Sequence, residues 1–502
     1  MKICELIYKE ECISYTDNLD LEVDFITSDI YKVKDRCVFL AYNHLNFDIE
    51  GALPIFENYP TSVIISEKEL KIPIGVKNII RVENVRKTSA QMYKRFYYVD
   101  FNKLKFVGIT GTNGKSSTAT MLEHILLSDN RKVGFIGTGK IRICGKLITD
   151  TTYSMTTPDV DLLYPVIKRM ENAGCEIVVM EVSSHSLYFD KVSAIPFDIS
   201  IFTNLSSEHM DFHKSIDEYF KSKLKLLGLS KRMIFNMDDY YSRTAYHLYA
   251  GEKYGIGIIQ DGDVMARDIK LSGISESDYV YREQNRLFHV YLNLGGAYNI
   301  YNSLFAIKCA VLLGTEPSTV KKALKSLFKI EGRNEIVSFY PTVIIDYAHT
   351  PDAMLNELKH IKKYLKSGQN LITLFGCGGN RDRKKRGEMA KIANTYSDMV
   401  IVTSDNSRNE SKTQIFKDRL SGFTDTAKRK VITSRENAIT QAIIKAGDDD
   451  VILIIGKGHE KYNIDKDGVH YFDEKEIINN AISKRNKVRN NENKTELSSL
   501  TH

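Results

Sequence analysis

The fold is decided by Phe106-Val-Gly-Ile-Thr-Gly-Thr-Asn-Gly-Lys-Ser116. An apolar run over residues 105–109 passes into a loop with two glycines, and helical periodicity follows over residues 117–127. Strand, glycine loop and helix in this order form a phosphate cradle, because the loop N–H groups and the N-terminus of the helix face the same anion. The segment therefore predicts a nucleotide-binding parallel sheet.

Within this loop, Lys115 would supply positive charge to the β- and γ-phosphates, and the Ser116 hydroxyl is placed to ligate Mg²⁺. The usual phosphate-loop pattern needs a glycine at position 109, where this chain has Ile109. The alternative is a glycine turn that merely enters a helix. The flanking strand and helix favour the phosphate loop, whose expected nucleotide-binding residues are Gly111, Thr112, Asn113, Gly114, Lys115, Ser116 and Ser117.

Length and composition describe a folded protein of several domains. The 502 residues are 42% hydrophobic and 27% charged, enough for two to four domains at roughly 100–200 residues each. A net charge of 70 − 64 = +6 is too small to indicate a nucleic-acid-binding protein. The seven cysteines form no CxxC pair, and no run reaches the roughly 18 apolar residues of a membrane span. We expect a cytoplasmic protein without membrane or nucleic-acid partners.

The alternation of elements outward from the loop predicts an α/β chain of three domains. Strand-like runs alternate with helical periodicity from residue 103 to 331, and a second alternation of the Rossmann type follows over residues 332–483. Residues 1–102 have short apolar runs typical of a small α/β domain, and residues 484–502 are expected to form a frayed polar tail. The expected core strands are 105–109, 177–180, 199–202 and 233–235 in the central domain and 343–345, 371–375, 399–402 and 451–455 in the last.

Two strand ends carry candidate metal ligands. Glu181 follows the run 177–180, and His209 follows the run 199–202. Open parallel sheets bind ligands at the carboxyl ends of their strands, where a carboxylate can hold Mg²⁺. The alternatives are a solvated strand end for Glu181 and an ordinary surface histidine for His209.

Further segments extend the pattern along the chain, and together they resemble the Mur ligase superfamily, in particular its branch that adds the third residue of the peptidoglycan stem peptide. The resemblance implies an ATP-dependent ligase that joins an amino acid to a carboxylate through an acyl phosphate. It rests on residues 104–480, in the segments Gly108–Ser116, Met180–His185, Thr203–His209, Asp217–Lys223, Tyr298–Asn302, Glu331–Arg333, Ile345–Pro351, Phe375–Asp382, Thr403–Asn406 and Gly456–Glu460.

The resemblance also implies roles for individual residues. Glu181, His209 and a carbamylated Lys223 would hold two Mg²⁺ ions together with Ser116, although Lys221, Lys223 and Lys225 read equally well as the polar face of a surface helix. Carbamylation needs a neutral amine and so a lowered pKa. The adenine would lie against Asn299 and Asn302, and the C-terminal domain would reach the nucleotide through Arg333 and Asp346.

The incoming amino acid would be recognised in the C-terminal domain. Arg408 can grip a carboxylate with its planar guanidinium, and only meso-diaminopimelate offers one at its far end. We therefore favour meso-diaminopimelate over L-lysine, although Ser407 stands where the resembling proteins have proline. The expected amino-acid site comprises Arg381, Asp405, Asn406, Arg408, Gly456 and Glu460.

The acceptor implied by the resemblance is UDP-MurNAc-L-Ala-D-Glu, bound by Asp29, Thr156, Thr157, Ser183 and Lys191. The chain departs from the pattern here. The serine and arginine that usually follow Asp29 are absent, and Phe189 and Lys191 replace a glutamine and an arginine. Two readings stay open: a divergent ligase of this branch that contacts uridine differently, and a paralogue acting on another carboxylate such as a polyglutamate or a specialised peptide.

A third hypothesis is a catalytically silent nucleotide-binding protein. Intact Lys115, Glu181, His209, Arg333 and Asp346 argue against it. The expected ligands are therefore ATP, Mg²⁺ and two small-molecule substrates, and we expect the chain to act as a monomer.

Overall fold

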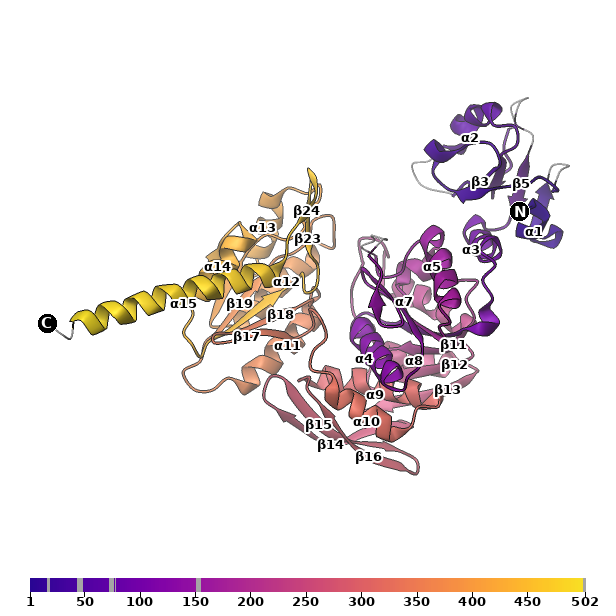
Figure 1. The fold of residues 1–502 in the computed structure, drawn as a ribbon. Coiled ribbons are helices and arrows are strands. Elements are labelled where there is room, and N and C mark those ends of the chain that lie inside the picture. Colours follow the sequence, from indigo (N-terminus) through magenta and orange to yellow (C-terminus); the bar gives the residue numbers. More distant parts are fainter. Residues whose placement is uncertain (16–18, 43–47, 72–75, 77, 150–154, 500–502) are drawn as a thin grey trace.

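The computed structural model describes residues 1–15, 19–42, 48–71, 76, 78–149 and 155–499. Three α/β domains follow one another along the chain, each built on its own sheet (Figure 1). The expected fold class is confirmed. The domain boundaries near residues 102 and 331 stay a prediction. One sheet lies before residue 102, one lies between the two boundaries, and one lies after residue 331. Among the described residues, no helix combines the length and the apolar character that crossing a membrane requires.

The N-terminal domain has a five-stranded sheet of order β1-β5-β4-β3-β2, parallel except for β1. Its helix α3 ends the domain and faces the central one. The elements are β1 Cys12–Tyr15, β2 Phe25–Thr27, β3 Cys37–Leu40, β4 Val63–Ser66, β5 Ile79–Val82, α1 Ile3–Leu6, α2 Ile49–Ala52 and α3 Val85–Phe96.

The central sheet has eleven strands in the order β16-β15-β14-β13-β12-β11-β6-β10-β7-β8-β9. Its middle is parallel, with β6 between β10 and β11. The four strands expected from the sequence are confirmed as β6, β10, β11 and β12. The strands are β6 Lys105–Thr110, β7 Val133–Gly137, β8 Lys140–Ile143, β9 Lys146–Leu147, β10 Ile177–Glu181, β11 Phe197–Phe202, β12 Arg232–Asn236, β13 Glu252–Gly257, β14 Val264–Ser272, β15 Glu276–Glu283 and β16 Arg286–Leu292.

Two features of this sheet position the site. Because β6 is central, its glycine loop opens at the carboxyl edge between neighbouring strands. Ile109 is fully buried in β6, so the strand occupies the position where the usual pattern has its first glycine. The helices are α4 Lys115–Ser128, α5 Val160–Asn172, α6 Ser184–Tyr188, α7 Ile216–Leu224, α8 Tyr240–Leu248, α9 Ala297–Leu312 and α10 Pro317–Ser326.

The C-terminal sheet has the order β17-β18-β22-β19-β20-β21, parallel except for the edge strand β17. Separate apolar clusters cover its two faces, which confirms a doubly wound domain. The elements are β17 Glu335–Phe339, β18 Thr342–Asp346, β19 Leu371–Phe375, β20 Met399–Val402, β21 Arg429–Val431, β22 Val451–Ile455, β23 Tyr462–Asp465, β24 Gly468–Tyr471, α11 Pro351–Tyr364, α12 Lys384–Tyr396, α13 Lys412–Leu420, α14 Arg435–Lys445 and α15 Glu474–Ser499.

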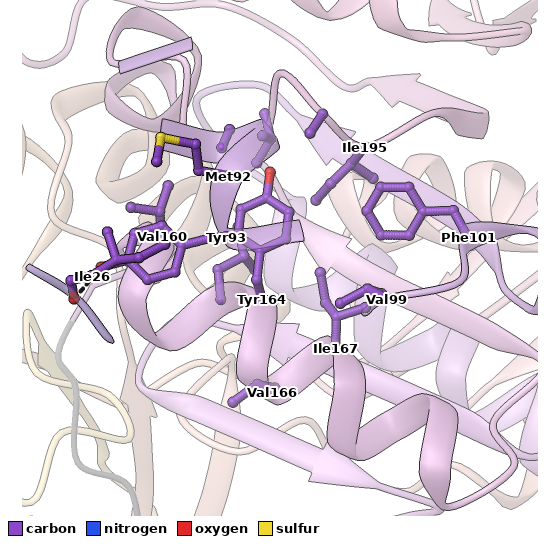
Figure 2. Packing of buried hydrophobic residues seen from close by; sticks show 14 of the residues in the cluster. Ile26, Met92, Tyr93, Val99, Phe101, Val160, Tyr164, Val166, Ile167 and Ile195 are labelled. Carbon is purple, nitrogen blue, oxygen red and sulfur yellow. Dashed lines mark hydrogen bonds between the residues drawn. The ribbon is translucent and has the colours of Figure 1, made fainter. Parts of the chain in front are cut away.

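The N-terminal and central domains share one apolar core. Figure 2 shows Tyr93 of α3 next to Val160 and Tyr164 of α5, all of them buried. The Tyr93 hydroxyl also donates a hydrogen bond to the Ile26 carbonyl oxygen, 3.2 Å away. Burying a side chain of this size stabilises a fold by roughly 1.5–3 kcal/mol. The N-terminal domain is therefore anchored to the central one by a dry interface.

The expectation of a frayed polar tail is wrong for residues 484–499, which continue helix α15 away from the domain (Figure 1). Arg485 holds the start of this extension. Its guanidinium is 2% exposed and donates to the Ile443 and Ala446 carbonyl oxygens at the end of α14 and to Asp448. The missing apolar periodicity misled the analysis, because a buried arginine ties the helix down through hydrogen bonds.

Arg485→Ala should destabilise the C-terminal domain by about 1–3 kcal/mol, because carbonyl groups at the end of α14 lose a charged donor. Denaturant unfolding followed by circular dichroism measures this. Lys484→Ala, an exposed neighbour on the same helix, is the control and should leave stability unchanged. Equal stability of both variants would show that Arg485 does not hold α15.

Candidate active site

The glycine loop is closely surrounded. Gly111 has φ +141°, and a Cβ there would lie 1.9 Å from Thr203 Oγ1. Gly114 has φ +85°, and its Cβ would lie 2.5 Å from Asn302 Oδ1. Both positions therefore exclude a side chain, because a Cβ at either one would clash with a neighbouring atom. At Gly114 the left-handed backbone also disfavours any residue other than glycine.

Lys115 begins helix α4 and folds back over the loop. Its Nζ donates to the Gly111 carbonyl oxygen at 2.9 Å and to that of Thr112 at 2.8 Å. Burial lowers the pKa of this ammonium, whereas Glu208 and Glu181 oppose the shift. Lys115 therefore places a positive charge on the loop where phosphates would bind, as the sequence predicts.

Glu181 ends β10 and is 1% exposed. Its carboxylate accepts hydrogen bonds from Ser116 Oγ at 2.9 Å and from the backbone N–H of Thr138 at 3.1 Å. Arg333 of the C-terminal domain also donates to Ser116 Oγ, at 3.1 Å. A hydroxyl and a carboxylate thus lie side by side at the start of α4, and a cation from the next domain reaches the same hydroxyl.

A second acidic group lies across the loop. Glu208 is 6% exposed, and its carboxylate lies 2.6 Å from His349 Nε2 and 3.7 Å from His209 Nε2. Burial works against its charge, yet His209 and His349 hold the pKa of Glu208 well below its usual value. Burial lowers the pKa of His209 to about 4, which keeps its imidazole neutral and able to bind a metal.

Glu208 was not among the site residues predicted from the sequence. It directly precedes His209 after β11, at the same sheet edge as Glu181, so its position was a usable signal. Its partner His349 belongs to the C-terminal domain. The Glu208–His349 pair therefore closes the site from the far side of the domain boundary.

Lys223 is set apart from its neighbours on α7. It is 1% exposed, whereas Lys221 and Lys225 face solvent. Its Nζ donates to the Gly111 carbonyl oxygen at 2.9 Å. Burial, followed by the nearby charge of Lys115, lowers the pKa of Lys223 well below its usual value. The alternative of a surface helix therefore does not describe Lys223, and its carbamylation stays a prediction.

A cavity that is partly open to solvent lies between the glycine loop, α9 and the start of the C-terminal domain. On α9, Asn302 Nδ2 donates to Asn299 Oδ1 at 3.3 Å, so the two amides share one face as expected. The structure thus brings together Asn113, Gly114, Ser117, Asn299, Asn302, Arg333 and Asp346 around one space.

The wall from the C-terminal domain carries charge. Asp346, at the end of β18, accepts from the backbone N–H groups of Asn334 at 2.7 Å and Ala348 at 2.6 Å, and burial raises its pKa. Tyr298 of α9, in the central domain, donates through its hydroxyl to the carboxylate of Glu357 of α11 at 2.5 Å, a contact across the domain boundary that the sequence did not indicate. Their signal was weak, because a tyrosine and a glutamate on helices usually face solvent or core.

Unpaired polar atoms indicate that this cavity is built for a polar ligand. Among the described residues, Arg333 Nε and Glu357 Oε1 are buried without a hydrogen-bond partner. Burying such atoms unpaired costs about 1–3 kcal/mol each. A nucleotide with phosphate and hydroxyl groups would satisfy them.

The chemistry of the donors near the loop fits Mg²⁺. Within the described part of the chain, no three His, Cys, Asp or Glu side chains gather into a metal cluster. The donors come as separate small sets, Ser116 with Glu181 and Glu208 with His209. Mg²⁺ suits such sites, since it keeps several waters and is bound through one or two carboxylates and substrate phosphates.

The predicted amino-acid site is assembled beyond the cavity. Asn406 Nδ2 donates to Glu460 at 3.0 Å, and Asn406 Oδ1 accepts from the buried Lys457 at 2.7 Å. Asp405 lies beside Gly456, where a Cβ would come 2.8 Å from its carboxylate. Burial opposes ionisation of Asp405, but Lys457 and Arg435 hold its pKa below the usual value.

Arg408 and Arg381 lie near the same glycine. A Cβ on Gly378 would be 2.8 Å from Arg408 Nη1 and 3.8 Å from Arg381 Cγ. Burial and the charge of Arg381 lower the pKa of Arg408. Arg408 Nη1 donates to the Gly379 carbonyl oxygen at 3.0 Å, and Arg381 Nη1 lies 3.9 Å from an Asp211 carboxylate oxygen. Two arginine side chains thus adjoin the same glycine, and each could bind a carboxylate.

The predicted acceptor residues divide into two groups. Thr157 Oγ1 accepts from the Ser183 backbone N–H at 3.1 Å, and Thr156 Oγ1 accepts from Thr138 at 3.2 Å, so these residues adjoin Glu181. Lys191 is paired with Asp159. Asp29 lies in the N-terminal domain and accepts from the Tyr31 N–H at 3.0 Å. No contact among the described residues joins Asp29 to the rest of this site.

A glycine loop on one domain and an arginine and aspartate from the next define a nucleotide-dependent enzyme whose site is completed between domains. Comparison with known families agrees. Residues 109–310 match the Mur ligase middle domain, and residues 332–458 match the Mur ligase, glutamate ligase domain. The chain belongs to the Mur ligase family.

Individual relatives cover nearly the whole chain. It is 36% identical to UDP-N-acetylmuramoyl-L-alanyl-D-glutamate--2,6-diaminopimelate ligase 1 of Clostridium acetobutylicum, over 96% of this chain and 99% of the relative. It is 37% identical to the corresponding ligase of Clostridium botulinum, over 95% and 99%. A solved UDP-N-acetylmuramoyl-L-alanyl-D-glutamate--2,6-diaminopimelate ligase superposes with a TM-score of 0.68 at 25% identity, over 97% of this chain and 99% of that one.

Lys115→Ala should lower turnover by about 10²- to 10³-fold, because the loop would lose the buried cation expected to meet the γ-phosphate. ATP-dependent release of phosphate measures this. The control is Lys105→Ala, an exposed lysine at the start of β6, which should retain full activity. Unchanged turnover in Lys115→Ala would show that the phosphate loop is misassigned.

Proposed function

We propose that this Mur ligase joins meso-diaminopimelate to the D-Glu γ-carboxylate of UDP-MurNAc-L-Ala-D-Glu, using ATP and an acyl-phosphate intermediate. The observation that carries the proposal is the shared cavity, in which the glycine loop, Asn302, Arg333 and Asp346 surround one space. The relatives named above are ligases of this reaction and match both ends of the chain. In this proposal the chain acts in the cytoplasm as a monomer.

The reaction places several anions together, and the residues counter their repulsion. Lys115 would face the transferred phosphoryl group from the loop, and Arg333 would face it from the C-terminal domain. Asp346 would bind the ribose hydroxyls, and Asn299 and Asn302 the adenine. Because positioning and charge stabilisation dominate phosphoryl transfer, these groups need only hold ATP and the acceptor carboxylate in line.

Two Mg²⁺ ions fit the donors on the two sides of the loop. Ser116 and Glu181 would hold one, and His209 with a carbamylated Lys223 would hold the other. Bound Mg²⁺ supplies positive charge to the phosphate oxygens. The buried amine of Lys223, whose pKa is lowered, is the group on which a carbamate would form by adding CO₂ with loss of a proton.

The C-terminal domain would deliver the attacking amine and exclude water. Arg333 on Ser116 and His349 on Glu208 bring this domain against the loop. An acyl phosphate exposed to solvent would hydrolyse, so closure protects it until the amine attacks. The amine displaces phosphate and loses its proton as the amide bond forms.

Charge favours meso-diaminopimelate over L-lysine as the added residue. Arg408 and Arg381 together offer two guanidinium groups where the distal end of the amino acid would bind. Meso-diaminopimelate has a carboxylate there, whereas L-lysine ends in an ammonium that these arginines would repel.

The acceptor is tested with a panel. We expect ATP-dependent phosphate release with UDP-MurNAc-L-Ala-D-Glu and meso-diaminopimelate. The mass of the product should exceed that of the acceptor by one diaminopimelate residue. The chain would be assigned to the paralogue instead if it turned over a polyglutamate acceptor and did not turn over the nucleotide sugar with either diamino acid. Mass spectrometry of the product decides between them.

Arg408→Ala should lower kcat/KM for meso-diaminopimelate by about 10- to 100-fold, because a charged hydrogen bond to its distal carboxylate is lost. The kcat/KM for L-lysine, measured at high concentrations of the amino acid, should change less than about threefold. Lys412→Ala, which removes an exposed charge nearby, is the control. An equal loss with both amino acids would remove Arg408 from substrate selection.

A further inference from the structure

A cation stacked between two aromatic rings joins the N-terminal and central domains. Arg86, in the first turn of α3, lies with its guanidinium carbon 4.6 Å from the ring centre of Tyr42 and 4.3 Å from that of Phe189. Tyr42 follows β3, and Phe189 directly follows α6. The three side chains therefore come from separate segments of two domains.

Local hydrogen bonds hold this stack in place. The Tyr42 hydroxyl is 3.1 Å from Ser89 Oγ, and Ser89 Oγ donates to the Arg86 carbonyl oxygen at 2.7 Å. Asn84, at the N-terminus of the same helix, donates to Asp190 at 3.4 Å, beside Phe189. Two aromatic rings thus lie against the guanidinium of Arg86, whose N–H groups lie in its own plane.

The charge of Arg86 is not balanced by an acid. Among the described residues, no carboxylate forms an ion pair with it, whereas the neighbouring cation Lys191 is paired with Asp159. Phe189 and Lys191 belong to the segment that follows α6, beside Thr157 and Ser183. The cation left available at this junction is therefore Arg86.

We infer that Arg86 binds the diphosphate of the nucleotide-sugar acceptor, an inference that rests on the proposed function. A guanidinium held flat between rings keeps its rotamer entropy cost low and presents a fork that matches two phosphate oxygens. Phe189 serves as one of the walls that orient this fork. A glutamine at this position could donate a hydrogen bond to the ligand. Phe189 cannot, and instead it positions the guanidinium of Arg86.

The test compares UDP with uridine, because the two differ only in the diphosphate. Isothermal titration should give wild-type protein a higher affinity for UDP than for uridine. In Arg86→Ala that ratio should fall by about 10- to 100-fold, the effect of a charged hydrogen bond to phosphate, with uridine affinity unchanged. Lys87→Ala, an exposed lysine next to Arg86, should retain the wild-type ratio.

Steady-state kinetics distinguish a role of Arg86 in ligand binding from a role in holding the two domains together. Arg86→Ala should raise KM for UDP-MurNAc-L-Ala-D-Glu and leave KM for ATP and for diaminopimelate unchanged. Phe189→Leu, which keeps an apolar wall without a ring face, should raise the acceptor KM by about threefold. Arg86→Lys should not restore the UDP-to-uridine ratio, because a point charge cannot replace the fork.

An unchanged UDP-to-uridine ratio in Arg86→Ala, or a wild-type protein that binds both ligands equally, would overturn the inference. A parallel rise of all three KM values with a lower unfolding midpoint would also overturn it and assign Arg86 a structural role. Failure of the proposed function is separate, because it would show as wild-type protein that turns over no nucleotide-sugar acceptor.

Discussion

Two lysine side chains meet at one carbonyl oxygen, and the site is arranged around that convergence. Lys115 and Lys223 both donate to Gly111, each at 2.9 Å. Two protonated amines this close would repel strongly in a medium of low dielectric constant, and the charge of Lys115 accordingly adds to the lowering of the Lys223 pKa by burial. Glu181 and Glu208 lie on opposite sides of the loop and offset part of the charge. A polyphosphate would offset the rest, so the protein carries in its fold the charge that its substrate needs.

Much of this arrangement could be predicted because it depends on local pattern. Apolar runs gave β6, β10 and β22, and glycine spacing gave the loop between β6 and α4. Parallel strands bring their carboxyl ends to one edge, so Glu181 at the end of β10 was expected at the same sheet edge as the glycine loop. The nucleotide-side residues gather for the same reason, although their individual roles stay predictions.

The parts that were missed depend on contacts between distant segments. Strands β14–β16 alternate polar and apolar residues at the edge of the sheet and carry no signature of a parallel strand. The pairing of Glu208 with His349 and the stacking of Arg86 on Phe189 each need two domains to come together. Arg485 was missed because buried guanidinium groups leave no trace in hydrophobic periodicity. All four features depend on tertiary contacts, which no local stretch of sequence contains.

The contact between Arg333 and Ser116 has a mechanical consequence. Arg333 lies just before β17, where the chain enters its last domain. Its guanidinium carbon also lies 4.4 Å from the ring centre of Tyr347, whose hydroxyl donates to Glu460 at 3.4 Å. Two side chains therefore connect Ser116 at the nucleotide site with Glu460 at the expected amino-acid site. A shift of Ser116 would reach the amino-acid site through them, so filling one site would alter the other.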